Sequence, residues 1–443
     1  MARRGQQPIN QRVLFVRAET DLFSEPPYDV TIQNSATVEY HPLNSVADRS
    51  APIQFFIQGN DVQYVDLTES KLYLRCKITD ANGGNIPFEA DHNVLDYAPV
   101  NNLLHTMFSN VSVHFNEVEV TSKGSLYSHR AYIETLLSKS KEFKKSQGEA
   151  CMFYRTKSEL TTVDDGYAKR RSIVDGSNIF EMIGRPHSEM FTQNRFVMAG
   201  IDIRVQFNRN SDAFCLMMSG TAPVDVRLCV MEAKLIVQKH ALLSSIQLDH
   251  IRTWESGHPI AYPMRRVDVR SYSLPVGTTQ HTSESLITGF LPDRLVLGLV
   301  KGTTLHGAYN TNCLAFEHFG LQHITVTTNS DQVQRSSMDM DFDASRAMQP
   351  YLSVFEGLGI ANQDPGIDLS YEEYKNGKTL FVYDLRHLRE AFCPPRHGNV
   401  SITLRFKNAI AHSLSVIAYL EYQAVMYINS DKQVYFRDFS KNP

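Results

Sequence analysis

Three aspartates have a spacing that could bind a metal ion. Asp339, Asp341 and Asp343 alternate with Met340 and Phe342, so an extended segment would point all three carboxylates to one side. Hard cations such as Ca²⁺ prefer oxygen ligands of this kind. The segment nevertheless lacks the glycine and the distal glutamate of a calcium-binding loop. The spacing therefore favours a solvated acidic edge, with cation binding as the alternative, and we predict no metal site.

Two glycine-containing segments resemble parts of phosphate-binding loops. Residues 376–379 (NGKT) end like a P-loop, but Glu372 stands where that loop has its first glycine, and its carboxylate would face the phosphates. Residues 357–362 (GLGIAN) begin like a dinucleotide-binding turn, yet they follow a predicted helix and have Asn362 in place of the third glycine. We interpret the first segment as a helix end and the second as a loop, and we expect no cofactor.

The spacings of common catalytic and metal sites are absent. The sequence contains neither H-E-x-x-H nor G-x-S-x-G. His318 and His323 lie five residues apart, which on a strand places them on opposite faces. The six cysteines form no C-x-x-C pair and are predicted to be reduced core residues: Cys76, Cys151, Cys215, Cys229, Cys313 and Cys393. We therefore predict no catalytic residues and no enzymatic activity.

Contact with nucleic acid could come from the N-terminal segment. The chain as a whole has 44 Lys and Arg against 48 Asp and Glu, which excludes a strongly basic surface, so any DNA contact should be local. The first 50 residues are rich in Asn, Gln and Pro and are predicted to form an extended arm. Its arginines could contact DNA phosphates, pair with a neighbouring subunit, or only solvate the arm: Arg3, Arg4, Arg12 and Arg17.

The elements that would position these residues are mostly strands. Apolar and polar residues alternate, as in strands with one buried face, over residues 72–78, 111–120, 201–207, 224–230, 295–299, 324–326, 380–385, 402–406 and 414–428. Within residues 111–120, Asn116 and Glu117 predict a tight hairpin turn. Nothing alternates strand with helix as a parallel sheet would. The sequence therefore predicts an all-β, antiparallel protein.

Few helices are expected. The clearest covers residues 125–138, where apolar residues recur at helical spacing and Arg130 and Glu134 lie between them. A second covers residues 344–357 and is interrupted by Pro350. A short third has Ser370 as its N-cap, Glu373 completing a capping box, and Gly377 just beyond its end.

The strand series occurs twice, which predicts two tandem sandwiches. We place an arm at residues 1–50, a first sandwich at 51–243 with a polar, ordered insertion at about 139–193, and a second sandwich at 244–443. The junction should lie between Lys239 and Ser256, with Trp254 packed in it. No apolar run is long enough to span a membrane, and the N-terminus lacks the apolar core of a signal peptide.

Several segments, taken in order, resemble the double jelly-roll major capsid proteins of polinton (maverick) elements and adintoviruses. The resemblance runs in register from about residue 55 to residue 430. It is carried by residues 64–74 (YVDLTESKLYL), 99–113 (PVNNLLHTMFSNVSV), 130–137 (RAYIETLL), 212–216 (DAFCL), 262–267 (YPMRRV), 291–296 (LPDRLV) and 373–385 (EYKNGKTLFVYDL). The arm and the insertion at 139–193 show the least likeness.

This resemblance implies two jelly rolls side by side in a structural virion protein. It implies a homotrimer of pseudo-hexagonal outline and an icosahedral shell around double-stranded DNA, assembled inside the host cell. The partners would be further copies of the chain, penton and minor capsid proteins, and packaged DNA touched weakly or through the arm. The alternative from the residues alone is a carbohydrate-binding or carbohydrate-cleaving β-sandwich, which needs paired carboxylates across a groove.

Overall fold

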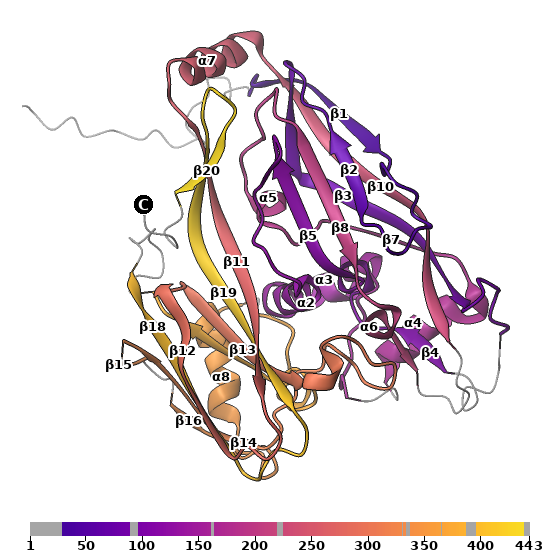
Figure 1. Cartoon of the computed structure of the whole chain (residues 1–443), viewed down its shortest axis with the longest axis vertical. Coiled ribbons are helices and arrows are strands. Elements are labelled where there is room, and N and C mark those ends of the chain that lie inside the picture. Colours follow the sequence, from indigo (N-terminus) through magenta and orange to yellow (C-terminus); the bar gives the residue numbers. More distant parts are fainter. Residues whose placement is uncertain are drawn as a thin grey trace, which may run out of the picture.

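The structure is a computed structural model that describes residues 29–88, 96–160, 164–218, 225–329, 331–333, 337–364, 366–386 and 396–437. Within these ranges the chain forms two antiparallel β-sandwiches that stand side by side (Figure 1), each made of two sheets of four or five strands. The all-β, two-sandwich prediction is confirmed.

The first half of the chain contains the strands of one sandwich and most of the helices. In chain order its elements are β1 (Ile32–Tyr40), β2 (Ile53–Ile57), β3 (Gln63–Asp80), β4 (Tyr97–Pro99), α1 (Leu103–Thr106), β5 (Phe108–Phe115), β6 (Val118–Glu119), α2 (Tyr127–Ser138), α3 (Lys141–Lys145), the 3-10 helix η2 (Gln147–Cys151), α4 (Asp165–Val174), the 3-10 helix η3 (Asp175–Ser177), β7 (Phe180–Gly184), α5 (Glu189–Thr192), β8 (Ile203–Arg209), α6 (Asp212–Cys215), β9 (Leu216–Met218), β10 (Val226–Leu242) and α7 (Ser244–Glu255).

The second half forms the other sandwich. Its elements are β11 (Ile260–Leu274), β12 (Gln280–Phe290), β13 (Arg294–Lys301), the 3-10 helix η4 (Gly302–Thr304), β14 (Leu321–Thr328), β15 (Asp331–Gln332), β16 (Met338–Asp339), α8 (Met348–Leu358), α9 (Tyr371–Lys375), β17 (Leu380–Asp384), β18 (His397–Phe406), β19 (Leu414–Ile428) and β20 (Val434–Arg437).

The sheet orders are similar in the two halves. The first sandwich faces the sheet β1-β10-β3-β7 against β2-β8-β5-β6, and a small sheet pairs β4 with β9. The second faces β11-β19-β13-β17 against β12-β18-β14-β15, with β20 beside β19 and β16 beside β14. Strands far apart in sequence are hydrogen-bonded neighbours in each sheet, so each sandwich needs strands from most of its half of the chain.

The predicted alternation of apolar and polar residues corresponds to an alternation of buried and more exposed side chains in the strands. In β3 the inward side chains Leu72, Leu74, Cys76 and Ile78 are buried, and β10 pairs antiparallel along this strand with Leu74 opposite Ala233. The β5–β6 hairpin turns at Asn116 and Glu117, whose φ angles are 46° and 71°. Two-residue turns with positive φ at both positions have a backbone twist that matches the twist of the flanking strands. The hairpin prediction is confirmed.

The longest strands of the second half serve both cores. The second sandwich uses the first part of β19 around Leu414, whereas Ala424, Met426 and Ile428 at its other end, with Tyr262 and Met264 of β11, pack in the core of the first sandwich. Figure 1 shows β11 and β19 running from the second sandwich alongside the first towards α7. This two-stranded ribbon therefore joins the two cores.

Two predicted helices match the structure and one differs in detail. α2 begins at Tyr127 and ends at Ser138, and α9 has the predicted capping box between Ser370 and Glu373. The prediction that Pro350 interrupts a helix is wrong, because α8 begins at Met348 and Pro350 lies in its first turn. There the missing N–H of proline breaks no helical hydrogen bond.

The region from residue 139 to residue 193 contains α3, η2, α4, η3, β7 and α5, and β7 pairs with β3 of the first sandwich. Helix α7 lies where the junction was expected, between β10 and β11, and Trp254 is half-buried against Tyr64, Met198 and Leu242. The Trp254 indole Nε1 donates to the carbonyl of Ile428 at 3.2 Å. Trp254 therefore lies in the joint, as predicted.

Candidate functional site: the joint between the two sandwiches

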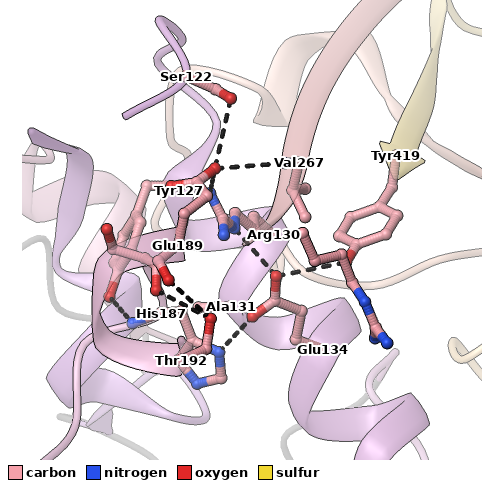
Figure 2. Close-up of polar contacts among 12 residues, drawn as sticks. Ser122, Tyr127, Arg130, Ala131, Glu134, His187, Glu189, Thr192, Val267 and Tyr419 are labelled. Atoms are coloured by element: carbon pink, nitrogen blue, oxygen red, sulfur yellow. Dashed lines mark hydrogen bonds and ion pairs between the residues drawn. The ribbon is translucent and has the colours of Figure 1, made fainter. Parts of the chain in front are cut away.

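A cluster of buried charged side chains lies where α2 meets the second sandwich (Figure 2). The Arg130 guanidinium donates from Nη1 to Glu189 Oε1 and from Nε to Glu134 Oε1, each at 2.9 Å. His187 Nδ1 lies 2.6 Å from Glu134 Oε2. Arg130 and Glu134 are one turn apart on α2, whereas His187 lies just before α5 and Glu189 is the first residue of α5.

Both strands of the ribbon contribute to this cluster. The backbone N–H of Val267 in β11 donates to Glu189 Oε1 at 3.2 Å, and the Tyr419 hydroxyl of β19 donates to Glu134 Oε1 at 3.3 Å. Figure 2 shows Val267 beside the Glu189 carboxylate and Tyr419 beside that of Glu134. The cluster therefore ties α2 of the first half to the strands of the second.

The ionisation of the cluster is set by its own charges. Burial alone would raise the pKa of Glu134, but the charge of Arg130 and the hydrogen bond with His187 outweigh it and lower that pKa to about 2. Burial opposes the charged form of Arg130 as well, yet the charges of Glu189 and Glu134 raise its pKa. Burial, and then the neighbouring His187, lower the pKa of His105 well below its ordinary value. Glu134 is held ionised, so it cannot act as the proton donor that glycoside cleavage needs.

A second buried polar network joins the 139–193 region to the second sandwich. Glu159 is buried and accepts hydrogen bonds from the Tyr132 hydroxyl at 2.6 Å and from Asn312 Nδ2 at 2.7 Å. Arg155 Nε donates to Glu373 Oε1 at 2.8 Å, which links this region to α9. These contacts satisfy buried carboxylates that would otherwise be costly to bury.

A cavity of about 590 Å³ opens beside the ion cluster. It is lined by α2, by residues 185–194, and by β11, β13 and β19. Its polar lining includes Arg130, Lys139, Arg185, Arg265, Arg294, Glu134 and Glu421. Glu421 pairs with Arg265 at 2.7 Å and with Arg294 at 3.1 Å. This hollow lies in the joint and has a polar wall, unlike the apolar hollow of about 480 Å³ between α7 and β11, which Trp254 lines.

The three alternating aspartates do not form a common metal-binding site in the structure. Asp339 contacts His323 at 2.7 Å, Asp341 pairs with Arg346 at 3.0 Å, and Asp343 pairs with Lys407 at 2.7 Å. No group of three or more His, Cys, Asp or Glu side chains that could hold a metal ion is found in the described ranges. Each aspartate instead contacts its own neighbouring basic side chain.

The other candidate residues lie in separate places. Lys378 of the NGKT segment is buried and donates to the carbonyl of Thr156 at 2.6 Å. His318 stacks on Phe342, whereas His323 bonds to Asp339, so the two histidines share no partner. Five cysteines are free thiols, and Cys393 lies outside the described residues. The four arm arginines Arg3, Arg4, Arg12 and Arg17 also lie outside them.

Sequence reasoning missed the ion cluster. Arg130 and Glu134 lie between the apolar residues of α2, a position that does not by itself indicate burial, yet Arg130 is 9% exposed. The only local signal was their i,i+4 spacing, which allows an ion pair. Their burial depends on residues 187–189 and on the ribbon, which are distant in sequence.

Comparisons with known proteins agree with this architecture. No family model matches the chain. A chain of the Sputnik virophage structure superposes with a TM-score of 0.66 at 10% identity, covering 99% of this chain and 95% of that one. The mavirus major capsid protein gives a TM-score of 0.57 at 9% identity over 99% and 98% of the two chains.

The chain has a double jelly-roll fold. The Faustovirus major capsid protein shares it, with a TM-score of 0.55 at 7% identity over 94% and 92% of the two chains. In sequence, the chain is 24% identical over 427 residues to the uncharacterized protein F54H12.2 of Caenorhabditis elegans, covering 94% of this chain and 98% of that protein. Within the described residues no helix is long and apolar enough to cross a lipid bilayer.

Proposed function

We propose that the protein is a viral major capsid protein that works by binding copies of itself. The observation that carries the proposal is the pair of side-by-side jelly rolls, which aligns over nearly the whole chain with capsid proteins of viruses and virophages. The order of motifs noted in the sequence supports the polinton or adintovirus type within this class. These neighbours are similar to the chain in fold, and self-assembly is the property by which the proposed function is tested.

The proposed assembly unit is a homotrimer. Three chains with two similar lobes each give six lobes, and a six-lobed unit tiles a surface with nearly hexagonal contacts. We propose that such trimers form an icosahedral shell around double-stranded DNA, together with penton and minor capsid proteins. The near balance of 44 basic and 48 acidic residues would let like units stand side by side without strong repulsion.

The surface offers apolar side chains for contacts between copies. Phe88 is 69% exposed, and Met348 and Leu352, one turn apart on α8, are 57% and 52% exposed. Large apolar side chains at the surface are enriched in the centres of permanent protein interfaces. We propose that some of these residues are covered by neighbouring subunits.

The rigid joint supports a structural role. A shell protein must keep its two lobes at a fixed angle, and the buried ion cluster, the Glu159 network and the shared ribbon all resist bending between them. Both carboxylates of the cluster, Glu134 and Glu189, are ion-paired with Arg130, and the lowered pKa of Glu134 keeps it ionised. We therefore propose that the protein is not an enzyme.

The predicted arm at residues 1–50 does not stay apart from the fold over its whole length, because Ile32–Tyr40 form β1 and pair with β10. We propose that residues 1–28, which lie outside the described residues, reach a neighbouring subunit or the interior of the shell. This segment carries Arg3, Arg4, Arg12 and Arg17, and a few flexible cations are enough for local phosphate contacts. Deletion of residues 2–28 should lower trimer stability or particle yield. An arm-deleted protein with unchanged trimer stability and unchanged assembly would refute this part of the proposal.

Light scattering on the purified chain tests the proposed function. A trimer should have three times the chain mass of 50.3 kDa, at micromolar concentration and in moderate salt. A stable monomer under these conditions would contradict the proposal. Binding on a glycan array, or measurable glycoside hydrolysis, would favour the carbohydrate-binding alternative instead.

A further inference from the structure

The cavity in the joint carries more positive than negative charge. Its described lining has five cationic side chains, Arg130, Lys139, Arg185, Arg265 and Arg294, and two carboxylates, Glu134 and Glu421. A third carboxylate, Glu189, lies behind Arg130 and pairs with it. With His187 counted as neutral, the balance is an excess of two positive charges.

Most of the charges around the cavity are already paired. Arg130 is shared by Glu134 and Glu189, and Glu421 is shared by Arg265 and Arg294. The excess therefore belongs to Lys139 and Arg185. Neither of these two side chains forms an ion pair with a carboxylate in the described part of the chain.

Lys139 and Arg185 also lie close enough to repel each other. Burial is the main cause that lowers the pKa of Lys139, and the positive charge of Arg185 is the next. The charge of Glu134 offsets part of this repulsion at Lys139, but neither cation has an ion pair of its own within the described residues, so their like charges raise the energy of this arrangement. An anion bound between them would remove that repulsion.

Another cationic residue of the lining, Arg294, has an unused hydrogen-bond donor. The Nε atom of Arg294 is buried and has no hydrogen-bond partner, although the Nη1 atom of the same side chain pairs with Glu421. An unpaired buried N–H costs free energy, so an acceptor inside the cavity would be favourable. Thr192, Gln193 and Asn194 add further polar groups to the wall.

We propose that this cavity binds a small oligophosphate anion, with Lys139, Arg185 and Arg294 as its cationic contacts. The cavity volume of about 590 Å³ lies in the range of small-ligand sites, and guanidinium groups suit phosphate oxygens because they can bind two at once. Because the walls come from both jelly rolls, a bound oligophosphate would hold the rolls together. The inference rests on the cavity and does not depend on the proposed capsid function.

Isothermal titration calorimetry on the full chain tests the proposal, with inorganic tripolyphosphate and ATP as separate probes. We expect saturable binding of one tripolyphosphate per chain and a rise of several degrees in Tm at saturation. ATP that binds more tightly than tripolyphosphate would identify a nucleotide site, and equal affinities would identify a site for the phosphate chain alone. Sulfate at matched ionic strength should compete weakly.

Variants distinguish this cavity from general surface attraction. The double variant Lys139→Gln, Arg185→Gln should raise the Kd for tripolyphosphate by about 10–100-fold. The matched control is Lys141→Gln, Lys145→Gln, which removes the same charge from exposed positions of α3 outside the cavity and should leave the Kd unchanged. Arg185→Gln alone changes an exposed side chain, so it should weaken binding without unfolding the protein. Absence of saturable binding, or equal losses in the two double variants, would overturn the proposal.

Discussion

Replacing Glu134 by Gln should lower the stability of the joint by a predictable amount. The pKa of Glu134 falls from its ordinary value of 4.5 to about 2 in the fold, a difference that corresponds to roughly 3 kcal/mol. Removing one partner of a buried ion pair usually costs about 3–5 kcal/mol. We therefore expect Glu134→Gln to lower the free energy of unfolding at pH 7 by about 3 kcal/mol.

The same pKa fixes how the effect depends on pH. A carboxyl whose pKa is lowered by folding stabilises the protein fully above the pKa of the unfolded chain, near 4.5, and this contribution is lost as the pH falls towards 2. The difference between the wild-type protein and Glu134→Gln should be largest at pH 7 and should shrink between pH 4.5 and pH 2. Urea unfolding at fixed protein concentration, followed by circular dichroism and Trp254 fluorescence, measures it.

A matched surface variant separates burial from charge. Glu117 pairs with Arg204 at 2.6 Å, but its side chain is 72% exposed, so Glu117→Gln should cost no more than about 1 kcal/mol. Equal costs for the two variants would refute the claim that burial makes the Glu134 cluster important. A Glu134→Gln effect that stays constant from pH 7 to pH 2.5 would refute the lowered pKa.

Two further substitutions and one chemical modification test how the side chains pack inside the protein. A Cβ atom at Gly357 would lie 2.4 Å from the carbonyl oxygen of Val382, so Gly357→Ala should lower the stability by about 1–3 kcal/mol in thermal unfolding. The control Gly366→Ala, where the nearest atom to the new Cβ is 4.0 Å away, should not lower it. Equal Tm values for the two variants would contradict the close contact of α8 with β17. Trp254→Phe removes the hydrogen bond to Ile428 and should lower the free energy of unfolding by about 1 kcal/mol, as measured by circular dichroism. An unchanged Tm would show that this hydrogen bond does not stabilise the joint. Burial raises the pKa of the Cys76 thiol to about 12, so iodoacetamide at pH 8 should leave Cys76 unmodified in the native protein and alkylate it in urea. Peptide mass spectrometry measures the modification. Alkylation of Cys76 in the native protein would contradict its burial.

The sequence predicted those parts of the fold that depend on local pattern. Alternation located β3 and β10, because each of these strands buries one face along its length. The capping box of α9 and the Asn116–Glu117 turn were recognisable because their hydrogen bonds and φ angles involve neighbouring residues.

The joint could not be predicted in the same way. Arg130 and Glu134 have the spacing of ordinary solvated residues, and their burial comes from His187, Glu189 and the ribbon, which the chain brings from far away. The sharing of β19 between two cores was equally hidden. Residues 414–421 are buried on both faces and residues 422–428 are only partly so, and neither pattern says which core the strand covers. Helix α7 was not predicted. Its apolar residues Ile246, Ile251 and Trp254 are only partly buried, against Tyr64, Met198 and Leu242, and Tyr64 and Met198 come from distant positions in the sequence.

Electron microscopy of the purified, full-length chain tests the central claim most directly. If the two jelly rolls exist to bind further copies of the chain, two-dimensional averages will show trimers with six lobes and a nearly hexagonal outline, alone or arranged in shells. Averages that show only single two-lobed particles, at concentrations where light scattering also gives a monomer, would contradict it.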